Sequence, residues 1–164
     1  MKSILLLATI MFLSQSCTKQ DIEMEQKTEF ATANKMLADD FPGEIQSVYF
    51  QGWVSGVRGG GSGTDFYIEL AQPLPEGVEF SHLYFRDKRE PITQINKTLY
   101  VATFPNDGNN GNEDILLSKN KTIVNAVHSL RVDDMQAILA YYEDNVLKLH
   151  VLSELKEIFP LEYP

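Results

Sequence analysis

The sequence predicts a mainly β protein, with a compact antiparallel β-sandwich-like domain that follows a signal peptide and an acidic tether. From residue 44 onward, short runs rich in β-branched and aromatic residues alternate with turn-forming clusters of Gly, Pro, Asn and Asp. This pattern is typical of several short antiparallel strands. Hydrophobic residues make up 43% of the chain, which is enough for one core. A single cysteine permits no intramolecular disulfide, so the fold must depend on that core.

The first 16 residues have the anatomy of a secretory signal peptide. Lys2 precedes a ten-residue apolar run, Ile4 to Leu13, and polar residues then lead to Cys17. A short buried helix is the alternative, but a run placed directly behind an N-terminal lysine favours a cleaved signal. A span of the bilayer would need about 18 apolar residues. A cysteine at the cut site predicts a lipoprotein of the bacterial cell envelope, anchored to the outer membrane by diacylglycerol and palmitate on Cys17.

Residues 17–43 are the predicted acidic tether, and 44–164 the single globular domain. Between residues 18 and 44, seven acidic side chains stand against three lysines. A short helix from Glu29 to Ala38 is an open alternative to an irregular segment. Removal of the signal takes away Lys2 and leaves 13 basic against 23 acidic side chains, a formal charge of −10. Such a chain is unsuited to nucleic acid, because phosphate binding depends on Lys and Arg.

The domain opens with a strand predicted from Ile45 to Val54. Val48 and Phe50 alternate with Tyr49 and Trp53, so both faces carry apolar groups and we expect the strand in the middle of a sheet. Two-residue turns are expected at Asp87-Lys88 and Asn96-Lys97. The other expected strands are Asp65–Leu70, Val78–Arg86, Glu90–Ile95 (an edge strand, because of Pro91), Leu99–Phe104, Ile115–Leu117 and Ile123–Val127.

The tail allows two interpretations. Apolar residues of Val132–Leu155 recur at a spacing of three or four, as in a helix. The same segment also contains Asp144-Asn145, a pair suited to a two-residue hairpin turn, between Gln136–Glu143 and Val146–Leu152. We favour the hairpin, which sets Tyr142 opposite Leu147 and Ala140 opposite Leu149. One helical turn is expected from Ser153 to Ile158, before Pro160.

The glycine run at residues 59–63 is the most distinctive local feature. It lacks the Gly-Lys-Ser/Thr of a phosphate loop and the spacing of a dinucleotide fingerprint. One interpretation is a loop that lets a partner approach backbone amides, with an arginine and a tryptophan beside it. The other is a hairpin connection without a ligand. The candidate contact surface consists of Trp53, Arg58, Gly59, Gly60 and Gly61.

No metal or cofactor site is predicted. The loop Asn106–Asp114 is rich in oxygen ligands, but it does not match the spacing of an EF-hand calcium loop. A non-standard cation site there remains open. His82, His128 and His150 fall on separate elements, without the spacing of a zinc site.

Several segments carry a family resemblance. The stretch from Tyr49 to Ile68, the triplet Tyr84-Phe85-Arg86 and the ending Pro160–Pro164 resemble small lipoproteins of flavobacteria and other Bacteroidetes. The resemblance covers most of the mature domain. It implies export and a compact β fold, and it implies no activity, cofactor or catalytic residue.

The sequence therefore favours a non-enzymatic envelope module that binds another protein or an envelope polymer. One alternative is an envelope-associated hydrolase that uses paired carboxylates such as Asp65, Asp107 or Asp114, which would have to converge in a cleft. A structural spacer without a specific ligand is the third possibility.

Overall fold

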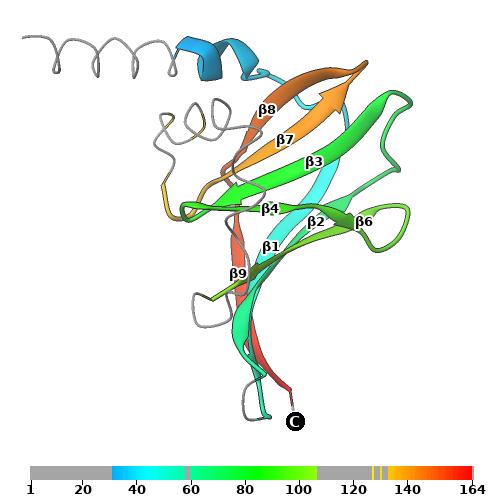
Figure 1. Cartoon of the computed structure of the whole chain (residues 1–164). Coiled ribbons are helices and arrows are strands. Elements are labelled where there is room, and N and C mark those ends of the chain that lie inside the picture. The colour runs from blue at the N-terminus through cyan, green and yellow to red at the C-terminus, as the bar shows by residue number, and fades with distance from the viewer. Residues whose placement is uncertain (1–30, 58–59, 107–126, 128–129, 131–132, 164) are drawn as a thin grey trace, which may run out of the picture.

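The structure is a computed structural model that describes residues 31–57, 60–106, 127, 130 and 133–163, with the side chains of 162 and 163 excepted. Within these residues the protein is mainly β, and two antiparallel-rich sheets pack together as a β-sandwich-like domain (Figure 1). The predicted fold class is confirmed. The strands are β1 (Ile45–Ser55), β2 (Ser62–Leu70), β3 (Val78–Phe85), β4 (Lys88–Pro91), β5 (Thr93–Gln94), β6 (Leu99–Pro105), β7 (Ala137–Glu143), β8 (Val146–Leu152) and β9 (Lys156–Tyr163).

One sheet has five strands in the order β5-β6-β2-β1-β9, and the other has four in the order β4-β3-β7-β8. Neighbouring strands are antiparallel except for β1 and β9, which run parallel. The predicted central place of β1 is confirmed, because β2 and β9 flank it. Its two apolar faces follow from this position: Val48 and Phe50 are buried in the core, whereas Tyr49 and Trp53 are half-buried on the outer face.

The core lies between the two sheets. Alternate residues of β1, β2, β3 and β6 turn their side chains inward, and the rings of Phe50, Phe66 and Phe104 all lie within 6 Å of Phe85. Leu83, Leu139 and Tyr141 are fully buried beside them. A second, smaller apolar cluster lies on the other side of the four-stranded sheet, where Ile138 and Leu149 pack against Met36 and Leu37.

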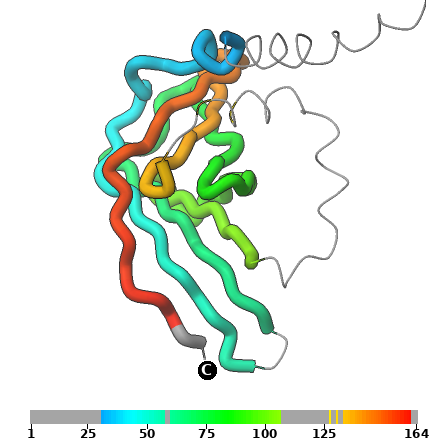
Figure 2. Tube along the Cα trace, turned by 90° about the vertical axis from the view of Figure 1, so that its left-hand side faces the viewer, coloured from blue at the N-terminus to red at the C-terminus, as the bar shows by residue number. Residues whose placement is uncertain are grey.

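The five-stranded sheet is longer than the sheet that covers it. Phe85 is the last residue of β3 and touches Phe50 and Phe66. Beyond these contacts β1 continues to Ser55, and β2 begins at Ser62. Figures 1 and 2 show β1, β2 and β9 running on together past the end of the four-stranded sheet. We call this extension the arm; it consists of residues 51–55, 62–65 and 158–163. The end of β6, residues 103–105, pairs with the β2 edge of the arm at residues 63–65.

The segment before β1 packs on the domain from residue 33 onward. Residues 31–36 form a helix, which agrees with the helix expected from Glu29 to Ala38 over the part that is described. Leu37 forms a β-bridge with Leu149. The ring of Phe41 lies 5.2 Å from that of Tyr141 and 5.8 Å from that of His150. These residues of the predicted tether therefore lie against the sandwich. Residues 1–30, including Cys17, lie outside the described residues.

The hairpin predicted in the tail is confirmed. Asp144 and Asn145 adopt φ values of 51° and 64°, as a two-residue turn of type I′ requires. β7 and β8 pair antiparallel, and their register sets Tyr142 opposite Leu147 and Ala140 opposite Leu149, as predicted. The turn residues were sufficient to predict this register because the two strands of the hairpin follow each other directly in the sequence.

Three other expectations are wrong. The tight turn after β3 is Arg86-Asp87 rather than Asp87-Lys88, since those two residues have positive φ and Phe85 pairs with Lys88. The strand expected from Glu90 to Ile95 is two strands, β4 and β5, in different sheets, because Ile92 turns into the core between them. The helical turn expected from Ser153 is absent: β9 starts at Lys156 and pairs with β1. The strands expected at 115–117 and 123–127 lie outside the described residues, apart from Val127.

Candidate functional site

The arm carries the described part of the predicted contact surface. Trp53 lies on β1, and Gly60 and Gly61 lie in the connection to β2. Gly61 has a φ of +79° and its carbonyl accepts a hydrogen bond of 3.0 Å from the amide of Ser55. Positive φ explains the preference for glycine at this position. Arg58 and Gly59 lie outside the described residues, so the structure does not place them relative to Trp53.

The indole of Trp53 lies over a glycine on the neighbouring strand. Trp53 is paired with Gly63 in the β1–β2 ladder, and a Cβ added to Gly63 would fall 2.7 Å from Cζ2 of the indole. The missing side chain of Gly63 therefore makes the space that the ring occupies. Within the described residues, Nε1 of Trp53 is buried without a hydrogen-bond partner. The ring is half-buried and forms part of the outer surface of the arm.

Large apolar side chains gather at the arm. Of the eight that are exposed in the described part of the chain, four belong to the arm or to its β1–β2 connection. Phe159 is 92% exposed, Val57 63%, Val54 54% and Leu161 42%. We call these four residues the arm tip. Val54 and Leu161 lie on opposite faces of the arm, because Leu161 pairs with Trp53, the neighbour of Val54 on β1. Exposed apolar side chains that gather on one part of a fold mark a candidate interaction site. Sequence analysis did not identify Phe159 or Leu161.

The outer face of the five-stranded sheet carries polar side chains and two stacked tyrosines. The rings of Tyr49 and Tyr67 stack across β1 and β2, with centroids 4.9 Å apart. On one side of this pair the Ser47 hydroxyl donates to Glu69 at 2.9 Å. On the other side the Thr103 hydroxyl donates to Asp65 at 2.7 Å. Both carboxylates are therefore engaged by neighbouring hydroxyls.

These carboxylates do not form a hydrolytic pair. Asp65 and Glu69 are four residues apart on one strand, a separation of about 13 Å. Glycosidases need their two carboxyl groups within about 5 to 9.5 Å of each other. Asp107 and Asp114, the other acids that the hydrolase interpretation requires, lie outside the described residues. Asp65 and Glu69 thus do not form such a pair.

Ser81 and His82 form a hydroxyl–imidazole contact of 2.8 Å through Nδ1. Nε2 of the same ring lies 2.8 Å from Nη2 of Arg89. Because a guanidinium can only donate, Nε2 accepts and the proton of the neutral ring sits on Nδ1, from which it is donated to the serine oxygen. An imidazole in this tautomer is not able to remove the proton of Ser81. The contact is therefore not a nucleophile–base pair.

Two half-buried imidazoles predict a pH dependence of stability. Burial lowers the pKa of His82, and Arg89 lowers it further. Burial also lowers the pKa of His150, an effect that the Ala38 backbone and Asp40 partly offset. In the unfolded chain both rings return to a pKa near 6.5. Below about pH 6.5 the unfolded state therefore binds more protons than the folded state. The stability that is present above pH 6.5 is lost as the pH falls through the lowered pKa values of the folded state.

We expect the free energy of unfolding to be smaller at about pH 5.5 than at about pH 7.5, and the difference to shrink in a His82→Gln/His150→Gln double variant. Urea unfolding of both proteins at the two pH values is the measurement. The carboxylates and His128 are common to both proteins. A smaller loss of unfolding free energy on acidification in the double variant is therefore due to the two replaced rings. An equal loss on acidification in both proteins would show that the two half-buried imidazoles play no part.

Within the described residues, no group of three or more His, Cys, Asp and Glu side chains is arranged to hold a metal ion. The loop singled out for cation binding lies outside these residues except for Asn106, whose side chain donates to the Ser62 hydroxyl at 2.8 Å. No helix in the part of the chain that the structure describes is long and apolar enough to cross a bilayer. No family model, curated protein or solved structure matches the chain.

Proposed function

We propose that this protein is a lipid-anchored, non-enzymatic binding module of the bacterial cell envelope, held to the outer membrane through acylated Cys17. The arm tip is the surface that contacts its partner, and the partner is another envelope protein. The apolar character and exposure of the arm tip carry this proposal. The hydrolase alternative receives no support from Asp65, the one carboxylate named for it that the structure describes.

The position of the arm suits a tethered module. The described chain enters the sandwich at the helix of residues 31–36, and the arm projects from the opposite end (Figures 1 and 2). A lipid on Cys17 is attached to the chain on the N-terminal side of that helix. The arm tip would therefore point away from the end at which the chain is anchored, and it would be accessible to a neighbouring protein.

The chemistry of the arm tip favours a protein over a polymer. Val54, Val57 and Leu161 are aliphatic, and Phe159 offers an unsubstituted ring. These side chains supply no hydrogen-bonding groups, which a sugar polymer needs for recognition, but they match the desolvated centre of a protein–protein interface. The net negative charge of the chain also argues against nucleic acid as the partner.

The test is capture by the tagged full-length protein from detergent-solubilised envelopes. We expect a Phe159→Ser/Leu161→Ser variant to retain about tenfold less of a specific partner than the natural sequence. Ile95→Ser is the matched control, because Ile95 is 53% exposed but lies in the β5–β6 connection. The captured protein is then titrated into the purified chain, where the single tryptophan, Trp53, reports binding by a change in fluorescence.

Equal capture by the arm variant and the natural sequence would reject the arm tip as the contact surface. If the natural sequence captured no partner, the spacer interpretation would replace the binding module. Phe159 and Leu161 are exposed, so their replacement leaves the core intact and a loss of binding is not a loss of folding.

A further inference from the structure

A groove of about 480 Å³ opens beside the first half of β1. It lies where the chain leaves β8 and joins the edge of β1 as β9. Ile45, Ser47, Tyr49 and Ile158 line it together with Glu154 and Lys156. Its volume is within the range of binding sites for small molecules, roughly 300 to 1,000 Å³. None of its lining residues belongs to the arm tip.

One side of the groove is an open strand edge. β2 pairs with β1 from Ile45 onward, but the pairing of β9 with β1 begins only at Tyr49. Over residues 45–47, the β9 ladder supplies no partner to β1 on this side, and no other backbone hydrogen bond to these residues is found in the described chain. Successive residues of a strand direct their N–H and C=O groups to opposite sides. Some of these groups therefore face the groove unpaired, as on an edge that accepts an added strand.

Opposite charges stand at the rim. Glu154 and Lys156 are both exposed and line the groove. Their side chains form no ion pair with each other or with another described residue. The one salt bridge among the described residues joins Lys148 and Glu143. In an extended chain, the Cα atoms of residues two positions apart, such as Glu154 and Lys156, are separated by about 7 Å. The groove thus offers one carboxylate and one ammonium group that are free to bind a ligand.

Hydroxyl groups and an apolar floor complete the lining. Burial raises the pKa of Tyr49, and the nearby Glu69 carboxylate raises it further, so the phenol stays protonated as a hydrogen-bond donor. Glu154 is the one carboxylate among the residues that line the groove, so it is the group there that can meet a cation. Ile45 and Ile158 supply apolar contact. Backbone pairing, two charges and apolar contact together match a peptide rather than a sugar or a lipid.

We propose that this groove binds a short peptide with free termini, which pairs with the open edge of β1 as an added strand. Lys156 binds the peptide carboxylate and Glu154 binds its ammonium group. The three residues of the open edge, 45–47, span about 10 Å, so the peptide has about two or three residues. This site is separate from the arm tip and does not depend on the anchor, and it therefore adds a second binding activity to the proposed function.

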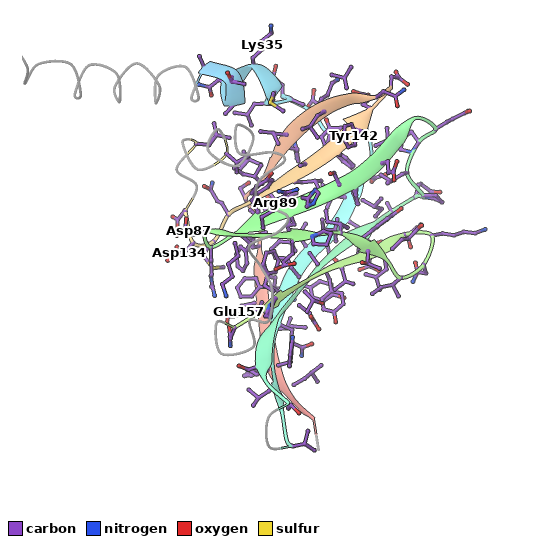
Figure 3. All side chains as sticks on the ribbon, viewed as in Figure 1. Lys35, Asp87, Arg89, Asp134, Tyr142 and Glu157 are labelled. Carbon is purple, nitrogen blue, oxygen red and sulfur yellow. The ribbon has the colours of Figure 1, made fainter. Side chains whose placement is uncertain are left out.

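The experiment is isothermal titration of the purified full-length protein with trialanine and with N-acetyl-trialanine amide. We expect saturable binding of free trialanine and binding about tenfold weaker for the capped peptide, because each terminus loses a charge-assisted hydrogen bond. Glu154→Gln and Lys156→Gln should each weaken binding of the free peptide by about tenfold. Matched controls are Glu157→Gln and Lys35→Gln, which do not line the groove; Figure 3 shows Lys35 on the helix.

Any one of three results would overturn the proposal. These are no binding of free trialanine, binding of the capped peptide as tight as that of free trialanine, or a loss of affinity in the control variants equal to that in the groove variants. All four substitutions change exposed side chains and leave the core intact. Thermal unfolding of each variant checks this. The arm variant Phe159→Ser/Leu161→Ser should bind trialanine normally, which separates this site from the proposed protein interface.

Discussion

Replacement of Phe85 by alanine should lower the free energy of unfolding by about 3 to 5 kcal/mol, the largest effect of a single side chain that we expect on stability. Phe85 is 3% exposed. Its ring centroid lies 5.1 Å from those of Phe50 and Phe66 and 5.9 Å from that of Phe104. It therefore joins β3 of one sheet to β1, β2 and β6 of the other, and its loss leaves a cavity that both sheets line.

Urea unfolding, followed by circular dichroism, measures this effect. Phe159→Ala is the matched control, because the same side chain is removed from a position that is 92% exposed. We expect the control to change the free energy of unfolding by less than about 0.5 kcal/mol. Similar losses in the two variants would contradict the position of Phe85 between the sheets and the exposure of Phe159 on the arm.

Gly63→Ala should destabilise the arm, with an expected cost of about 1 to 3 kcal/mol. The added Cβ would lie 2.7 Å from the Phe104 carbonyl oxygen and 2.7 Å from Cζ2 of Trp53. Backbone and indole must both move to relieve these contacts. Since Trp53 is the single tryptophan of the chain, its fluorescence should shift to longer wavelength as the ring becomes more exposed to water.

Gly52→Ala is the control for this prediction. It lies on the adjacent strand of the arm, yet the nearest atom to its added Cβ is Cβ of Pro160 at 3.9 Å, an ordinary contact. We expect an unchanged emission spectrum and an unfolding midpoint close to that of the natural sequence. Equal shifts from the two substitutions would mean that the indole does not lie over Gly63.

The parts of the fold that sequence analysis predicted are those set by neighbouring residues. The turn at Asp144-Asn145 fixes the register of β7 and β8, because the two strands follow each other directly. The two apolar faces of β1 indicate a central strand for a similarly local reason. Such signals require only the alternation of side chains and a turn that tolerates positive φ.

The missed elements depend on partners distant in sequence. β9 was expected to begin as a helical turn, because Ser153 is a good N-cap residue and Pro160 a helix terminator. Its partner β1 lies about one hundred residues earlier: the Gln51 side chain donates to the Phe159 carbonyl across 108 positions. In the same way, the division of residues 88–94 between two sheets follows from burial of Ile92, which local propensity does not show.

The candidate surface was predictable in part. Trp53 and the glycines stand out in the sequence because of their residue type. Phe159 and Leu161 did not, since their exposure depends on the position of β9 at the edge of the five-stranded sheet, in the part that runs on where β3 has ended. A strand length of this kind is set by pairing across the sheet, and the composition of the strand itself does not reveal it.

Mass spectrometry of the natural protein, isolated from the membrane pellet, tests the central proposal most directly. We predict a mature chain that begins at Cys17 and carries diacylglycerol and fatty acid, and whose labelling by palmitate and recovery in the pellet are both lost on Cys17→Ala substitution. More than one acyl chain is needed for stable attachment, so loss of the thiol should release the protein. A chain that retains Met1, carries no fatty acid and remains in the supernatant would contradict the anchor and the function proposed from it.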